Sequence, residues 1–312
     1  MTRFARRFRK VGRSLSRVEL MQSSMDATFA LTQEDLLDKQ AGRRFLDFFG
    51  DEGLRIALER YGFLDALRGR GYRDFRLEAW AHDERHTLLL DGVPEGGGEA
   101  VRLLELVVRR DRLSIEPVEG YVRPLDGRWE VLTVDWLSLR HPAGCFTPSR
   151  MRLPGQDAPG LGVGEQVLEL LYRVVDRLEL DGLVTVAEYF HNAVLYAREL
   201  PYVDPWFQGQ LEALEALLFA REQLTFAQAA WAVHWGYVID VDDSVVRWRG
   251  EAMLHTDDAA LTAYLGSQAY REQATRTAGG LRYQLRRRAF EERWAREEAH
   301  LLEPPSPEQD VC

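Results

Sequence analysis

The chain is poor in cysteine and in lysine. Its 312 residues include two cysteines, Cys145 and Cys312, and two lysines, Lys10 and Lys39. Two isolated cysteines do not provide a disulfide framework or a set of metal ligands, so we expect neither a disulfide scaffold nor a bound metal. This cysteine usage is typical of proteins in a reducing compartment.

Long apolar runs are also missing. No stretch approaches the length that a membrane-spanning helix needs, and the N-terminus lacks the apolar core of a secretory signal. We therefore expect a cytoplasmic protein. Its only route to a membrane is peripheral contact.

Positive charge is scarce outside one segment. The formal net charge is −10, which argues against nucleic acid as a partner, because phosphate neutralisation needs a concentrated basic surface. Residues 3–18 are the exception: they are strongly basic, and Phe4, Phe8 and Leu15 recur at helical spacing. Residues 3–18 form either an amphipathic helix that contacts an anionic membrane or a protein partner, or a loose basic tail.

Hydrophobic periodicity divides the first two thirds of the chain. Residues 32–50 read as a helix, and residues 51–72 read as a second helical stretch with breaks at Gly62 and Gly69. Residues 75–142 alternate in polarity and contain turn sequences, which predicts a meander of about four strands. A glycine-rich loop, a helix at about 165–180, a short strand and another helix follow, an α/β order whose strand pairs parallel with its predecessor.

The last third is mainly helical. Its exception is "YVIDVDDSVVRWRG", a hairpin candidate with Asp242 and Asp243 at the turn. We expect an α/β (α+β) protein in which helices flank a mixed central sheet. The predicted parts are an N-terminal segment (1–30), a catalytic or binding domain (31–208), a helical extension (209–302) and a disordered tail (303–312).

The sequence "PGLGVGEQVLELLYRVVDRL", residues 159–178, places Gly160, Gly162 and Gly164 directly before an amphipathic helix. Alternate glycines allow close backbone approach, and the N-terminus of a helix attracts anions. The spacing is not the dinucleotide fingerprint G-x-G-x-x-G, and no Gly-Lys-Ser/Thr of a Walker loop follows. The loop either binds a phosphate group or is a simple glycine-rich connection.

Together with "LVTVAE" and "NAVLYAREL", this stretch resembles the central motifs of the GNAT superfamily of acetyl-CoA-dependent N-acetyltransferases. The resemblance covers roughly residues 50–205. It implies a GNAT-like fold and an acetyl-CoA or other acyl-CoA cosubstrate whose pyrophosphate lies on residues 160–164. It also implies an amine acceptor. The residues matched to cofactor binding are Gly160, Leu161, Gly162, Val163, Gly164 and Asn192.

Acyl transfer from a thioester to an amine needs a base and, for the leaving thiolate, an acid. The resemblance implies Tyr196 as the acid, the alternative being an aromatic packed on an amphipathic helix. Candidate bases are Glu188 at a strand end and Asp135 or Glu130 on the strand before the loop. Glu188 also reads as a solvated strand end. His191 beside Asn192 is either an acid/base group or part of a helix start.

Two other chemistries have weak support. Cys145 lies four residues after His141, and His82 and His86 are four residues apart in what reads as a strand and turn, with no third ligand. Two functional hypotheses remain open. One is a GNAT-like acyltransferase. The other is a GNAT-fold binding or scaffold protein without catalysis, which Pro159 favours because it replaces the Arg or Gln usual in the family. A homodimer is compatible with both.

Overall fold

The computed structural model describes residues 3–23, 44–125 and 127–305. The chain divides into two compact units that interleave along the sequence. Unit 1 contains residues 1–112, 130–143 and 160–183; unit 2 contains residues 113–129, 144–159 and 184–312. The chain passes between the units five times, each time inside the predicted 31–208 domain and the last time at the strand that follows the glycine loop.

A mixed α/β architecture with a six-stranded sheet confirms the coarse fold class. The strand order is β1-β2-β3-β4-β5-β7. The first four strands are the predicted meander: β1 (Tyr72–His82), β2 (Arg85–Pro94), β3 (Val101–Leu113) and β4 (Trp129–Leu139). β2 pairs antiparallel with both β1 and β3. Alternating polarity specifies these strands because one residue in two faces the core.

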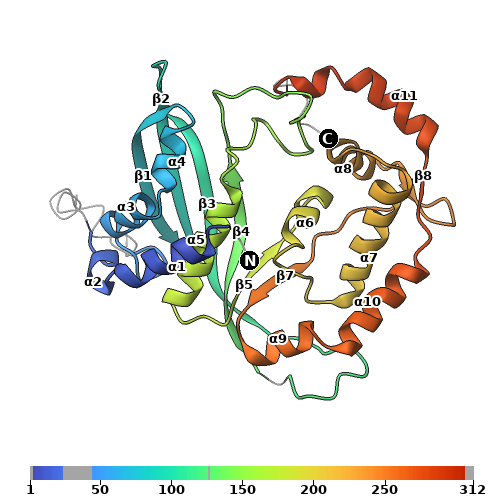
Figure 1. The fold of residues 1–312 in the computed structure, drawn as a ribbon, viewed down its shortest axis with the longest axis horizontal. Helices are drawn as coiled ribbons and strands as arrows, with labels where there is room; N and C mark the ends of the chain where they lie inside the picture. Colours follow the sequence, from blue (N-terminus) through green and yellow to red (C-terminus); the bar gives the residue numbers. More distant parts are fainter. Residues whose placement is uncertain (1–2, 24–43, 126, 306–312) are drawn as a thin grey trace. The chain divides into compact units, whose positions relative to one another are not determined.

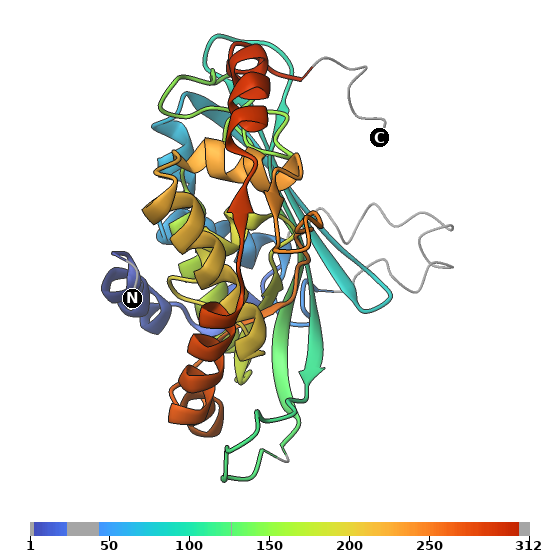
Figure 2. The same cartoon turned by 90° about the vertical axis from the view of Figure 1, so that its right-hand side faces the viewer.

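Helices cover one face of the strands of unit 1 (Figures 1 and 2). They are α1 (Ala5–Ser14), α2 (Arg17–Leu20), α3 (Asp51–Arg60), α4 (Phe63–Arg68) and α5 (Gly164–Arg177). The break between α3 and α4 falls at Gly62, whose φ of 74° suits glycine. The helix predicted over 32–50 lies mostly outside the described residues, and its described part, residues 44–50, is wrong: it forms a turn closed by a bridge between Phe45 and Phe49.

The basic N-terminal segment forms a helix whose apolar side is already buried. Phe8 is fully buried and packs against Tyr61 at a ring-centroid distance of 4.8 Å. Leu15 is also buried, whereas Arg6 and Arg9 are exposed. The surface that α1 offers to a partner is therefore its arginine side, not the apolar stripe seen in the sequence.

β5 (Gly182–Val186) is the neighbour of β4, as the α/β order predicts. The Asp181 amide donates to the Glu130 carbonyl at 2.7 Å, and the Glu130 amide donates to the Asp181 carboxylate at 2.7 Å. The first residues of both strands therefore lie together, as they do in parallel neighbours. Helix α5 makes the crossover between them.

Unit 2 is mainly helical. Its elements are α6 (Phe190–Tyr196), α7 (Pro205–Glu215), the π-helical segment η2 (Ala216–Arg221), α8 (Phe226–His234), β6 (Val238–Ile239), β7 (Ala252–Thr256), α9 (Ala259–Leu265), α10 (Gln268–Gly280), β8 (Gln284–Leu285), α11 (Arg287–Glu297) and η3 (His300–Leu302). α7 packs along α10, as Figure 1 shows. Gly209 of α7 permits this approach, because a Cβ there would lie 2.7 Å from the Thr277 Cβ.

The predicted hairpin is present in short form: the Asp240 amide donates to the Ser244 carbonyl at 3.0 Å, and the Val246 amide donates to the Val238 carbonyl at 2.9 Å. The Asp240 carboxylate accepts the amides of Asp242 and Ser244, and one isolated bridge joins Ile239 to Val245. The regular ladder of β6 is made instead with β8, in antiparallel register. Among the described residues, no helix combines the length and the apolar character needed to cross a membrane.

Candidate functional site

The glycine loop, residues 160–164, begins at the end of β4 despite the long segment between them in the sequence. Arg140 and Gly160 form an antiparallel bridge, and the Leu161 amide donates to the Leu139 carbonyl at 3.4 Å. The chain therefore leaves the end of β4 and returns to the same place. If the segment between β4 and the loop is left out, the elements follow one another as β4, glycine loop, α5 and β5, and β5 lies next to β4 in the sheet.

Side chains and glycines alternate between the inside and the outside of this loop. Leu161 and Val163 are both 2% exposed, whereas Gly162 and Gly164 face solvent. Gly162 is left-handed, with a φ of 66°, and Val163 follows with φ −113° and ψ 10°. A turn that contains a left-handed residue directs successive N–H groups to one side, as in anion-binding nests.

Arg70, which follows α4, fixes the peptide planes of the loop. Its Nε donates to the Leu161 carbonyl, and its Nη2 donates to the Gly162 carbonyl at 3.1 Å. In a trans peptide the N–H points opposite to the C=O. The amides of Gly162 and Val163 therefore point away from Arg70. The sequence offered no signal for Arg70, because the contact links distant segments.

The first turn of α5 carries an acid whose charge is already paired. Glu165 accepts the Arg3 backbone amide at 2.8 Å and forms an ion pair with the Arg3 guanidinium at 2.9 Å. The Arg3 side chain thereby offsets a carboxylate that would otherwise repel an anion at this helix end. A Cβ on Gly164 would meet no atom within 4 Å, so the start of α5 is open.

Of the two candidate bases on β4, one is engaged in ion pairs and the other lies far from the glycine loop. The Asp135 carboxylate lies 3.2 Å from the guanidinium groups of both Arg85 and Arg109. Glu130 lies at the start of β4, nine residues and roughly 30 Å from the end of the strand where the glycine loop begins. Asp135 is thus an ion-pair residue, and Glu130 is at the wrong end of the strand to act at the loop.

The remaining candidates lie in unit 2, on and just before α6. Glu188 is exposed and lines a cavity of about 310 Å³. The Asn192 amide donates to the Tyr189 carbonyl at 3.0 Å, within the first turn of the helix.

Burial raises the pKa of Tyr196. Its phenol therefore keeps its proton and releases it less readily than a free tyrosine, which makes it a weaker acid toward a thiolate.

His191 is the most perturbed group of that cavity. It is 4% exposed, and its Nδ1 has no hydrogen-bond partner among the residues that the structure describes. Burial, assisted by nearby His234, lowers the pKa of His191 to about 4. The imidazole is therefore neutral at physiological pH. It stacks on Tyr189 at a centroid distance of 5.4 Å.

The other histidine and cysteine candidates have ordinary roles or no partner. The Leu46 amide donates to His86 Nδ1 at 2.9 Å, so His86 holds a loop rather than a metal. His141 shares a 2.7 Å hydrogen bond with the Tyr72 hydroxyl, and Cys145 is exposed. Within the described ranges, no cluster of His, Cys, Asp or Glu side chains could hold a metal ion.

The predicted site residues are thus divided between the two units, and each group is described within its own unit. In unit 1 the loop glycines lie together with Arg70 at the start of α5, and in unit 2 Glu188 lies beside His191. No protein-family model, curated protein or solved structure matches the chain.

Proposed function

We propose that the chain is a GNAT-like acyltransferase that moves an acetyl or other acyl group from coenzyme A to an amine. The proposal rests on one observation. The chain returns to the end of β4, so that the glycine loop lies between β4 and α5, and β5 is the neighbour of β4 in the sheet. In this order, the glycine loop presents backbone N–H groups and the positive end of a helix dipole, to which a pyrophosphate can bind.

The glycine loop supplies the pyrophosphate site through its backbone. The amides of Gly162 and Val163 are oriented by Arg70, and the start of α5 adds a partial charge of roughly +0.5. The buried side chains of Leu161 and Val163 anchor the loop from below. The absence of side chains on Gly162 and Gly164 lets a phosphate reach the backbone.

Calorimetric titration of the full chain tests the proposal. Acetyl-CoA and pantetheine are compared, because pantetheine lacks the pyrophosphate. We expect acetyl-CoA to bind at least about tenfold more tightly, since charge-assisted hydrogen bonds to phosphate are the stronger ones. No acetyl-CoA binding at millimolar concentration, or equal binding of both ligands, would rule out the pyrophosphate site.

The variant Gly164→Asp separates ligand binding from folding. The new Cβ meets no atom within 4 Å, and a carboxylate in the first turn of a helix adds about 0.3–1 kcal/mol of stability. We therefore expect an unchanged or raised melting temperature and at least a tenfold loss of acetyl-CoA affinity by repulsion. Gly164→Ala is the matched control and keeps most of the affinity.

Transfer itself needs a base and an acid. The base deprotonates the amine, which attacks the thioester carbonyl, and the sulfur leaves as a thiolate that an acid protonates. If Tyr196 is that acid, Tyr196→Phe lowers kcat by roughly a hundredfold and leaves KM nearly unchanged. An unaltered kcat assigns Tyr196 to packing.

The alternative is a GNAT-fold binding protein that lacks catalysis. It is favoured by the Asp135 carboxylate, which is held by two arginines, and by the raised pKa of Tyr196. Tight acetyl-CoA binding without turnover on a panel of amines supports this alternative, and measurable acyl transfer excludes it.

A further inference from the structure

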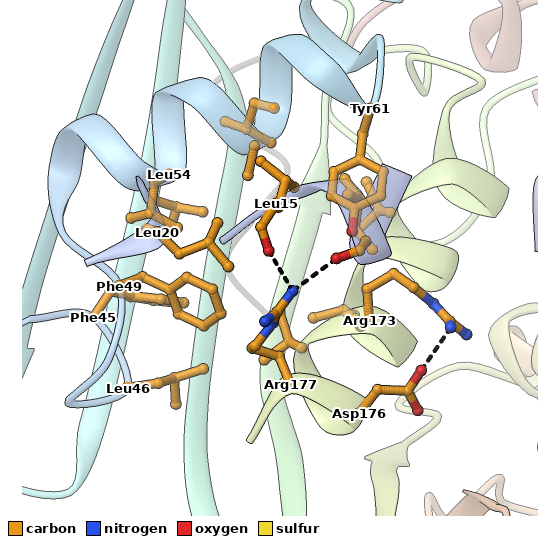
Figure 3. Close-up of a pocket in the computed structure, with 18 of the residues that line it drawn as sticks. Leu15, Leu20, Phe45, Leu46, Phe49, Leu54, Tyr61, Arg173, Asp176 and Arg177 are labelled. Carbon is orange, nitrogen blue, oxygen red and sulfur yellow. Dashed lines mark hydrogen bonds and ion pairs between the residues drawn. The ribbon is translucent and has the colours of Figure 1, made fainter. Parts of the chain in front are cut away.

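Unit 1 contains a cavity of about 690 Å³ on the helix-covered face of β2 and β3 (Figure 3). Gaps larger than a water molecule are few in close-packed protein interiors. The volume falls within the range of roughly 300–1,000 Å³ that is usual for small-molecule pockets. The wall that α5 gives to the cavity runs from Val167 to Arg177, and its arginines at the cavity rim, Arg173 and Arg177, lie nine and thirteen residues from Gly164, about 14 and 20 Å along the helix.

The inner wall of the cavity is apolar. Strand β3 contributes Leu104, Leu106 and Val108, which alternate and so lie on one face of the sheet. Phe45 and Phe49 line another side, as Figure 3 shows. These side chains carry no polar group, so the part of a ligand that fills this space is apolar.

Arg177 brings a cation into the cavity. Its Nη2 donates to the carbonyls of Gly12 and Leu15 at 2.7 and 2.9 Å, the two dashed lines that converge on Arg177 in Figure 3. It has no carboxylate partner among the residues that the structure describes. Carbonyl groups satisfy its N–H donors but leave its charge uncompensated.

The same rim carries three more arginines. Arg9 and Arg13 lie one turn apart on α1, and Arg173 and Arg177 lie one turn apart on α5. Like charges at this spacing repel one another. Arg173 is neutralised by Glu169 and Asp176, at 3.2 and 2.6 Å.

Carboxylates do not balance the rest of the rim. Within the described part of the chain, Arg9 and Arg13 have no such partner. Among the described residues that line the cavity, the acids are Asp176 and Glu179. Tyr61 also lines the cavity, and burial raises its pKa to about 12, so its hydroxyl remains a hydrogen-bond donor. The rim is complementary to an anion.

We propose that this cavity binds a single-chain amphiphile with an anionic headgroup. Its acyl chain lies against the leucines of β3 and the phenylalanines opposite, and its carboxylate or phosphate lies at Arg9, Arg13 and Arg177. A polar-headed chain fits because the apolar wall and the cationic rim belong to one cavity. The proposal is independent of acyl transfer at the glycine loop.

Displacement of cis-parinaric acid, a fluorescent fatty acid, from the full chain tests the proposal. We expect saturable fluorescence enhancement with a Kd at or below roughly 10 µM. The affinity measured by displacement should rise about fourfold for each added methylene group in the series decanoate, dodecanoate and tetradecanoate. Hexadecanoate and hexadecyl phosphate, compared in parallel, decide whether the headgroup is a carboxylate or a phosphate.

Two kinds of variant locate the ligand. Leu106→Trp places an indole among the leucines of β3, where the acyl chain is proposed to lie, at a strand position that favours aromatic residues, and should abolish parinarate binding. The double variant R9Q/R13Q changes two exposed side chains and should raise the Kd about tenfold without lowering the melting temperature. The matched control is R6Q/K10Q, which removes the same charge from exposed positions of α1 outside the cavity.

The outcomes divide cleanly. Binding that Leu106→Trp removes, that R9Q/R13Q weakens and that R6Q/K10Q leaves unchanged supports the proposal. No saturable binding, binding that survives Leu106→Trp, or equal weakening by the two double variants overturns it. Acetyl-CoA titration tests the glycine loop, and parinarate binding tests the cavity. Either proposal can therefore be rejected without affecting the other.

Discussion

His191 shows how burial alone can set the pH response of a single residue. Its pKa is lowered to about 4 from the ordinary 6.5, first by desolvation and then by the neighbouring His234. In the unfolded chain the imidazole returns to its ordinary pKa. Between these two values the unfolded state binds more protons than the folded state, so folding stability falls as the pH falls through this window.

We expect the native chain to lose about 2 kcal/mol between pH 7.5 and pH 5 through His191. His191→Phe keeps an aromatic ring beside Tyr189 and should lack this part of the loss. Urea unfolding at the two pH values measures it. His82→Gln, at the exposed last residue of β1, should retain the native pH response. Identical pH responses of His191→Phe and the native chain would contradict the assignment.

At the scale of elements, the contact between α7 and α10 depends on a residue without a side chain. A Cβ on Gly209 would lie 2.7 Å from the Thr277 Cβ and closer still to the Ala274 carbonyl oxygen. Backbone atoms cannot move aside as flexible side chains do. The two helices can therefore keep their present separation only with glycine at this position.

Gly209→Ala should lower the free energy of unfolding by about 1–3 kcal/mol, although alanine favours helix formation. The matched control is Gly279→Ala in α10, where a Cβ meets no atom within 4 Å and helix propensity should add up to about 1 kcal/mol. Thermal unfolding of the two variants compares them directly. A Gly209→Ala variant as stable as Gly279→Ala would mean that the helices separate without cost.

Local patterns predicted most elements, and nonlocal contacts account for what they missed. The four strands followed from alternating polarity, and the break at Gly62 from a residue that adopts a positive φ. The pairing of β6 with β8 could not be predicted, because no local pattern specifies a partner strand so far along the chain. Arg70 could not be predicted for the same reason, whereas the loop glycines could be identified from their spacing in the sequence.

At the scale of the whole molecule, the chain passes between the two units several times. Residues 113–129 and 144–159 belong to unit 2, although residues before and after each belong to unit 1. Contacts within unit 2 hold both segments. Tyr121 meets Tyr264 at a centroid distance of 5.2 Å, and Arg152 donates its amide to the Leu301 carbonyl at 3.0 Å.

The indole of Trp231 provides a further tie, because its Nε1 donates to the Arg152 carbonyl at 2.7 Å. Trp231→Phe removes this bond and keeps an aromatic ring, so we expect several-fold faster tryptic cleavage after Arg152 through easier local opening. Mass spectrometry of timed digests measures the rate. Trp206→Phe, at an exposed tryptophan, serves as the control and should leave cleavage after Arg152 unchanged.

The bridge between Arg140 and Gly160 also determines what sets the position of the glycine loop. Because the segment between these residues starts and ends at adjoining backbone positions, its length can change without moving the glycine loop. The place of the glycine loop relative to β4 is thus set by the hydrogen bonds between Leu139, Arg140 and residues 160–161, and not by the number of residues between them.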